Sequence, residues 1–358
     1  EEALIKSDKK GSILLISSWV LLILVVLAIG LGHRSSIALR LSAYQRDSLK
    51  ASYLAKAGIN QAILLLKEDA IANSSYNSLK SVWSTGLDPI TKKPLFENVE
   101  IKDGSGERFT VHYLYNDTDY LCMMDEERKI NINKIVTYPV LQFMLKKIFV
   151  DSDRIADADA DDLKNLVIKW IDLTIEGRDV DPDQIFKNSD LKATEEIIPI
   201  LEFFYKDESN PSLEAKKIYD KIKDLITVYG DGKININTAK EETLEILINS
   251  CIDEINKCPT AMQLDSRNLV TLISTIRNDN PFENSSGLVN VLTLTNNLNQ
   301  NEVIVLSKLA GISIATFKSD NFRINSTGEI TGKNISKTIT CVFSRVDPVN
   351  KIIYWHEN

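Results

Sequence analysis

Residues 8–34 read DKKGSILLISSWVLLILVVLAIGLGHR, a short charged leader followed by one glycine and an unbroken apolar run. No charged side chain occurs from Ser12 to Gly32, and these 21 residues as a helix would span roughly a bilayer core. A removable secretory signal usually has a shorter apolar core and ends at a small-x-small cleavage site, whereas this run ends in Gly-His-Arg. The stretch therefore predicts a retained membrane helix.

The membrane helix is expected to continue into water. Residues 35–66 contain no proline and a single glycine, and residues that favour helices dominate. Four small residues recur here at spacings of three and four: Ala51, Ala55, Gly58 and Ala62. They form a narrow stripe that lets the helix lie close against a sheet or another helix. Alanine is also simply a good helix former, so this second interpretation of the stripe stays open.

The composition of the chain limits the class of protein. At 358 residues the chain is long enough for two or three compact units, and its net charge of −8 disfavours nucleic-acid binding. The sequence lacks the GxSxG, HExxH and P-loop motifs, and its four cysteines show no CxxC spacing. We therefore expect neither an enzyme nor a zinc ribbon.

Runs of β-favouring residues near one end of the water-exposed part, and alternating polar and apolar residues near the other, predict strands. Residues 107–115 and 119–124 are typical of antiparallel strands, and residues 322–346 alternate around glycine-containing turns. The late strands are expected to return to the sheet that the early strands begin. The residues between them are therefore predicted to form an insertion between two parts of one sheet.

An internal repeat opens each half of this insertion. RKININK at residues 128–134 and GKININT at residues 232–238 each lead into a helical pattern. Thr238 and Glu241 fit a capping box at the second entry. This entry also resembles the first helix of helix-hairpin-helix DNA-binding modules, but residues 249–262 hold acidic side chains and no Gly-x-Gly turn. The repeat therefore predicts helices after each entry, and no nucleic-acid partner is expected.

The N-terminal part resembles a type IV pilin-like class III signal, in which Lys-Lys-Gly precedes an apolar helix that continues into water. Within that class, the apolar run with its early Trp19 and the Tyr-Leu-Ala-x-Ala-Gly block at residues 53–58 resemble the K-type minor pseudopilins of type II secretion systems. The resemblance covers residues 9–66 well. It is weaker in the insertion, where Trp170 and Asp172 match but the following residues differ.

The resemblance implies an α+β fold with one transmembrane helix. A pilin-like long N-terminal helix packs on an antiparallel sheet, which carries a large helical (SAM-like) insertion domain. The implied divisions are a cleaved leader 1–11, a transmembrane helix 12–32, its periplasmic continuation 33–70, the first strands 71–133, two helical subdomains 134–231 and 232–320, and the last strands 321–358.

The resemblance also implies how the N-terminus is processed and used. A prepilin peptidase would cut between Gly11 and Ser12, so that only the leader is removed. The fifth mature residue is then Ile16, where most pilins carry a glutamate that neutralises the terminal amine of the subunit above. A subunit without this carboxylate can sit without penalty only where nothing lies above it, at the filament tip.

The implied function is that of a minor pseudopilin that caps or nucleates the tip of a periplasmic pseudopilus for the export of folded proteins. The implied partners are the I-type and J-type minor pseudopilins, the prepilin peptidase and the inner-membrane assembly platform. The implied location is the bacterial inner membrane, crossed once, with the C-terminal part in the periplasm. A minor pilin or adhesin-like tip subunit of a type IV pilus is the alternative.

The four cysteines would tend to pair in an oxidising periplasm. Cys251 and Cys258 would close a small loop, and Cys122 with Cys341 would form a second disulfide across the sheet. Free buried thiols are the alternative to both of these pairs.

The resemblance implies calcium in the periplasmic part, and no other cofactor is expected. The acidic run at residues 151–162 has an alanine where an EF-hand loop needs its glycine, so it fails that pattern. Two oxygen-rich loops are the other candidates for calcium, with Asp103 and Glu107 in one and Asp117 and Asp119 in the other.

Overall fold

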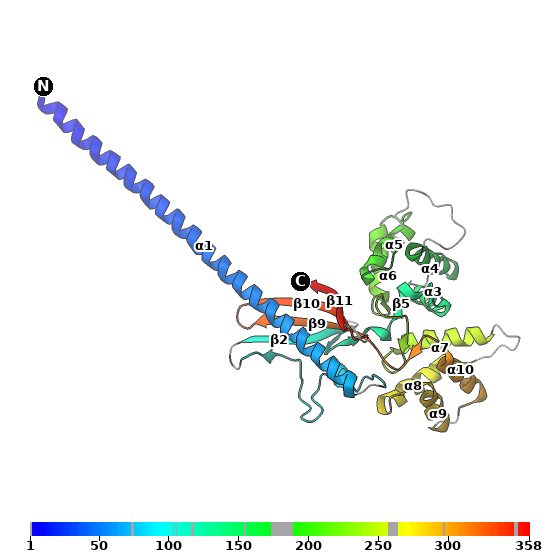
Figure 1. Ribbon diagram of the computed structural model, residues 1–358. Coiled ribbons are helices and arrows are strands. Elements are labelled where there is room, and N and C mark those ends of the chain that lie inside the picture. Colours follow the sequence, from blue (N-terminus) through cyan, green and yellow to red (C-terminus); the bar gives the residue numbers. More distant parts are fainter. Residues whose placement is uncertain are drawn as a thin grey trace.

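The N-terminal helix dominates the shape of the molecule in the computed structural model (Figure 1). Helix α1 runs without interruption from Glu2 to Ala72, and its 71 residues correspond to a length of about 105 Å. Among the described residues, one helix, α1, is long and apolar enough to cross a membrane. The structure describes all residues except 1, 73–74, 103, 105, 116–117, 154, 173–188, 257–263, 296–297 and 347–349.

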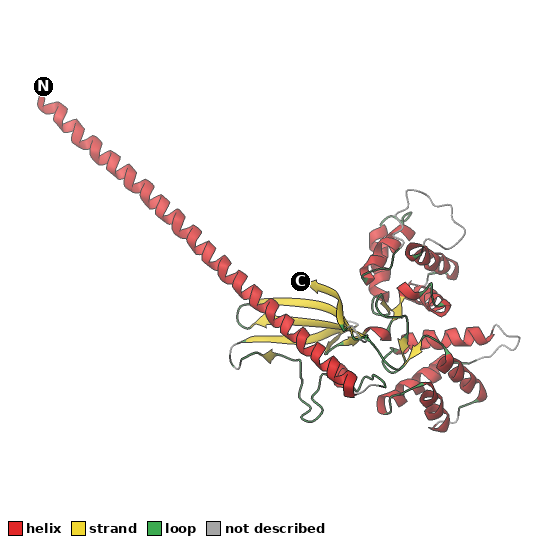
Figure 2. Ribbon diagram, in the orientation of Figure 1, coloured by secondary structure: helices red, strands yellow, loops and turns green. Residues whose placement is uncertain are grey.

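A sheet of seven antiparallel strands packs against the C-terminal part of α1 (Figure 2). Its order is β1–β2–β9–β10–β11, while β3 pairs with β2 and β4 pairs with β9. The strands are β1 Val99–Glu100, β2 Glu107–Tyr115, β3 Thr118–Leu121, β4 Met124–Asp125, β9 Asn321–Ile330, β10 Ile335–Ser344 and β11 Lys351–Glu357. Because β9 pairs with β2, the late strands do return to the sheet that the early strands begin, as predicted.

One face of β9 lies close against α1. Burial alternates along this strand, so that Phe322 and Ile324 are buried while Arg323 between them is partly exposed. A Cβ atom added to Gly328 would lie 2.5 Å from the backbone nitrogen of Ala55 and closer still to the carbonyl oxygen of Ala51. The stripe of small residues on α1 therefore faces the sheet and lets the two backbones approach each other.

Two helical lobes form the insertion. The first lobe contains α3 Pro139–Asp153, α4 Asp157–Ile171, α5 Ile198–Phe204 and α6 Pro211–Ile222. The second lobe contains α7 Glu241–Asn256, α8 Ser266–Asp279, α9 Ser285–Thr295 and α10 Gln300–Gly311. The remaining short helices are α2 Val82–Thr85, η1 Glu126–Arg128, η2 Ile132–Lys134 and η3 Thr194–Ile197.

The two ININ repeats supply equivalent strands at the bases of the lobes. Strand β5, Ile130–Asn131, pairs in parallel with β6, Ile226–Thr227, at the base of the first lobe. Strand β7, Ile234–Asn235, pairs in parallel with β8, Ala315–Thr316, at the base of the second lobe. Each repeat therefore opens its lobe, and the chain leaving that lobe pairs with it.

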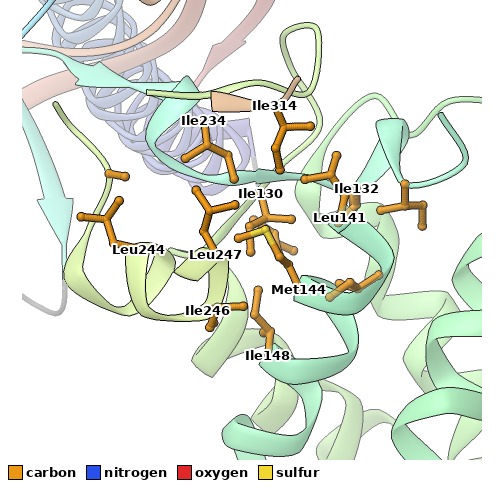
Figure 3. Close-up of a cluster of buried hydrophobic side chains, with 14 of the residues drawn as sticks. Ile130, Ile132, Leu141, Met144, Ile148, Ile234, Leu244, Ile246, Leu247 and Ile314 are labelled. Carbon is orange, nitrogen blue, oxygen red and sulfur yellow. The ribbon is translucent and has the colours of Figure 1, made fainter. Parts of the chain in front are cut away.

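A single hydrophobic core joins the two lobes (Figure 3). Ile130, Leu141 and Met144 of the first lobe gather with Ile234 and Leu247 of the second, and all five side chains are fully buried. A separate core lies between α1 and the sheet. The lobes are thus packed on each other as one unit.

The helical unit lies at one end of the molecule. In Figure 1 both lobes lie beyond the C-terminal end of α1, and the N-terminus lies at the opposite end. The α+β fold class predicted from the sequence is confirmed: a long apolar N-terminal helix, an antiparallel sheet and a large set of additional helices.

Candidate functional site

The first part of α1 is exposed on all sides. From Ile13 to Leu31 every side chain is exposed, including Ile16 at 61% and Trp19 at 62%. A contiguous apolar surface of this size is suited to contact lipid or other apolar helices. Gly11 and Ser12 continue the same helix, and for these two residues the structure describes the backbone path alone.

Five consecutive charged residues, Asp125–Lys129, are buried where the sheet meets the two lobes. We call this segment the polar joint. Asp125 accepts hydrogen bonds of 2.5 Å from the hydroxyl groups of Ser319 and Thr238. Burial raises the pKa of Asp125, although both of these hydrogen bonds oppose the shift. The joint thereby connects the start of the insertion to its end, since Asp125 and Ser319 are 194 residues apart.

The capping box expected at the second entry is wrong. Helix α7 begins at Glu241, so this residue is the first of the helix and not the fourth position of a capping box. The hydroxyl of Thr238 donates instead to Asp125. The Thr238 hydroxyl therefore makes a tertiary hydrogen bond instead of the helix cap that the local pattern predicts.

The pKa values of the two carboxyl groups after Asp125 are shifted in opposite directions. Burial raises the pKa of Glu127 well above its ordinary value, and the charge of Asp125 adds to that rise. Glu127 accepts hydrogen bonds from the backbone and side-chain nitrogens of Asn321 at 3.0 and 2.6 Å. Burial would also raise the pKa of Glu126, but nearby positive charge, chiefly that of Arg323 at 2.6 Å, lowers it to about 2. Glu126 is therefore ionised, and the neutral form of Glu127 is favoured.

Sequence reasoning missed the polar joint. A run of five charged residues is typical of a solvated surface, and nothing in its own composition indicates burial. Its position was the available signal, because the run ends directly before the first ININ strand. The partners of such a segment include residues in distant parts of the chain, here Ser319 and Asn321.

Arg345 fastens the end of α1 to the same region. Its guanidinium donates hydrogen bonds to the side chain of Asn77 at 2.5 Å and to the backbone carbonyl of Ser319 at 2.8 Å. The guanidinium also lies 3.5 Å from the carboxylate of Asp69 and over the ring of Phe322. The Arg345 side chain is only 2% exposed, so these contacts replace its hydration almost entirely.

Equivalent asparagines hold the two lobes in the same way. The Asn133 side chain donates to the carbonyl of Leu191 and accepts from its backbone N–H, both at 2.8 Å. The Asn237 side chain makes the same two bonds with Phe282, at 2.8 and 2.9 Å. The sequence repeat is therefore also a repeat of side-chain function, in which one amide anchors a distant loop of its own lobe.

The two expected disulfides, Cys122–Cys341 and Cys251–Cys258, have different outcomes. Cys122 and Cys341 are free buried thiols, which corrects the expected disulfide between them. Strands β4 and β10 pair with opposite sides of β9. Cys122 lies just before β4 and Cys341 lies in β10. Two strand spacings therefore separate the two residues, which is a distance of about 10 Å. That exceeds the reach of a disulfide. Cys251 is also free and buried, and Cys258 lies outside the described residues.

The acidic candidates for calcium do not come together in the part of the chain that the structure describes. Glu107 pairs with Lys50 at 2.7 Å, and Asp119 pairs with His112 at 2.7 Å, near opposite ends of β2. Asp103 and Asp117 lie outside the described residues. Within the described ranges, no group of three or more His, Cys, Asp or Glu side chains is placed to hold a metal ion.

The fold is similar to that of a chain in the crystal structure of the GspK–GspI–GspJ complex from the enterotoxigenic Escherichia coli type 2 secretion system. The TM-score is 0.53, and the alignment covers 88% of this chain and 99% of that chain. The sequence identity is 14%, so the likeness shows a shared fold. No protein-family model and no curated protein sequence matches the chain.

Proposed function

We propose that the chain is a K-type minor pseudopilin of a type II secretion system, which caps or nucleates the tip of a periplasmic pseudopilus. The observation that carries the proposal is the position of the two lobes beyond the C-terminal end of α1 (Figure 1). In a pilin-type filament the N-terminal helices lie side by side along the axis. Beyond the C-terminal end of α1, the lobes would occupy the position that the next subunit along the filament would need. A subunit of this shape therefore fits only at the end of the filament.

The fold likeness supports the choice of system and of partners. The similar chain belongs to a complex of GspK, GspI and GspJ. By analogy, we propose I-type and J-type minor pseudopilins as partners of this chain. The exposed apolar surface from Ile13 to Leu31 is the part of α1 through which neighbouring N-terminal helices would pack. A structural role of this kind requires no catalytic group.

The proposed processing begins in the membrane. A prepilin peptidase cuts between Gly11 and Ser12, and the apolar helix stays in the bacterial inner membrane with the sheet and lobes in the periplasm. Replacing Gly11 by leucine should block cleavage, whereas Gly11→Ala should be cleaved at least in part, because a small side chain is kept. N-terminal sequencing of the membrane-extracted protein decides this. A mature start at any residue other than Ser12 contradicts the proposal.

The tip position follows from Ile16. Cleavage leaves a charged amine in an apolar assembly, where an unpaired charge is costly, and isoleucine offers no carboxylate to a subunit above. Because the lobes still occupy the space of a further subunit, Ile16→Glu should trap the chain by pairing its new carboxylate with a neighbour's amine and so lower the number of labelled filament ends, while Ile16→Gln, which is polar but uncharged, should not. Immunogold labelling of sheared filaments measures this. Label spaced along the shaft for the unaltered chain would refute the tip position.

Co-purification tests the function as a whole. The full chain, extracted from membranes in detergent, should retain the I-type and J-type minor pseudopilins and the inner-membrane assembly platform. Deletion of its gene should reduce filament initiation and the export of folded proteins. Normal secretion, together with recovery of the chain from the end of a retractable pilus, would favour the type IV pilus alternative.

A further inference from the structure

A cavity of about 550 Å³ lies where the second lobe meets the sheet. The β2–β3 hairpin contributes Tyr113 and Tyr120, whose rings stack at 5.3 Å, and the start of α7 and one face of α8 form the opposite wall. Tyr113 is buried, whereas Tyr120 is 40% exposed. The cavity is therefore built by two separate parts of the fold and has an aromatic wall on one side.

Two buried arginines line this cavity. Arg128 of the polar joint is 3% exposed and Arg277 of α8 is 6% exposed. Burial lowers the pKa of Arg277 to about 10; the charge of Glu241 opposes that shift and the like charge of Arg128 adds to it. Two desolvated guanidinium groups repel each other, which raises the electrostatic free energy of the folded state. A nearby anion would lower that free energy.

Several hydrogen-bond donors at the cavity are unused. Arg277 donates through one terminal nitrogen to the carbonyl of Ile236 at 2.7 Å, while its Nε has no hydrogen-bond partner. Ser274, one turn earlier on α8 and 7% exposed, has a hydroxyl group without a partner. The start of α7 lines the same cavity, and the first backbone N–H groups of a helix have no acceptor within the helix. All of these groups favour a negative oxygen.

The charge of the lining limits what can bind. Lys240 and the two arginines bring three positive side chains, and Glu241 and Glu242 bring two negative ones. One further negative charge would balance the lining, and two would exceed it. The aromatic wall of Tyr113 and Tyr120 adds apolar surface, which suits an organic anion better than a fully hydrated inorganic one.

We propose that this cavity binds a single carboxylate group. The carboxylate receives hydrogen bonds from Arg277 and Ser274, and it lies close both to Arg128 and to the start of α7. The carboxylate belongs either to a small organic acid or to an acidic side chain of another polypeptide. This proposal is independent of the pseudopilin assignment, because it rests on the cavity alone.

The test uses the full chain in detergent at neutral pH and constant ionic strength. Sodium acetate and the peptide acetyl-Gly-Glu-Gly-amide, whose only charge is one carboxylate, are each titrated while the midpoint of thermal unfolding is followed. We expect a saturable rise in the midpoint, since a ligand that binds only the folded state stabilises it. Tighter binding of the peptide than of acetate indicates an acidic side chain as the natural source, and the reverse order indicates a small acid.

Three variants separate this site from a general effect of salt. Ser274→Ala removes a hydroxyl that has no partner in the chain, so it should fold normally and bind about 10-fold more weakly. Arg277→Gln should abolish the rise. Arg267→Gln makes the same charge change at an exposed position of the same helix and should leave the rise intact. The absence of a saturable rise with both ligands, or equal binding by wild type and Ser274→Ala, would overturn the proposal.

Discussion

Replacing Gly328 by alanine should separate α1 from the sheet. Gly328 lies in β9, and the added Cβ atom would meet the carbonyl oxygen of Ala51 and the nitrogen of Ala55 at or below 2.5 Å. Cβ atoms essentially never approach other heavy atoms closer than 3.0 Å. The obstacles are backbone atoms of a helix, so no side-chain rotation can relieve the clash.

The size of the effect follows from this geometry. Helix α1 would have to move away by about 1 Å, which would loosen its contacts with the fully buried side chains along the sheet. Overpacking that forces side-chain and backbone shifts typically costs about 1–3 kcal/mol, and a clash with helix backbone belongs at the upper end of that range, at about 3 kcal/mol. For a chain of 358 residues the entropy of unfolding is about 0.75 kcal/mol per kelvin, so such a loss lowers the midpoint of thermal unfolding by about 4 °C.

Tryptophan fluorescence of the full chain in detergent measures the change. Trp83 packs edge-on against Phe322 of β9 at 4.9 Å, so its emission reports on this part of the sheet. Gly287→Ala is the matched control, because its nearest neighbour outside the backbone lies at 3.6 Å and alanine favours the helix there. A Gly328→Ala midpoint within about 1 °C of wild type would refute the close contact of helix and strand.

Three further predictions concern the buried polar groups. Arg345→Leu removes the buried guanidinium that lies 3.5 Å from the carboxylate of Asp69 and should cost about 3 kcal/mol or more in the free energy of unfolding, measured by urea denaturation. Glu127 has a raised pKa in the folded state, so its contribution to stability is fully present below about pH 4.5, its ordinary pKa, and is lost as the pH rises through the folded value. Glu127→Gln should therefore flatten the dependence of the unfolding free energy on pH above 4.5; an unchanged slope would contradict the raised pKa. Asn133→Ala and Asn237→Ala each leave a buried N–H and carbonyl unpaired, and each should cost about 2 kcal/mol or more. Hydrogen exchange should increase first in the lobe that holds the altered asparagine, and equal increases in both lobes would contradict separate anchoring.

The elements that the sequence predicts well are those that local patterns define. The run from Ser12 to Gly32 predicts a membrane-length helix because it carries no charge and is predominantly apolar over the thickness of a bilayer core. A run of β-favouring residues predicts a strand at residues 107–115, and β2 has these bounds. The small residues on α1 predict a close packing face, although they do not say which strand it meets.

Other parts could not be predicted because they depend on contacts between distant residues. The disulfide assigned to Cys122 and Cys341 failed because the sheet places β9 between their strands, and strand order is not a local property. The capping assigned to Thr238 failed because Asp125, 113 residues earlier in the chain, takes its hydroxyl. A local pattern describes only the partners that lie near in sequence.

The sequence by itself determined the long helix, the early and late strands and the repeat that opens each lobe, since hydrophobic period and helix propensity act over a few residues. The tertiary structure alone decided that the charged run Asp125–Lys129 is buried and that Arg128 and Arg277 face one cavity. The physical reason is that burying a charge is favourable only when its partners are in place, and these partners come together only after the insertion has folded back onto the sheet.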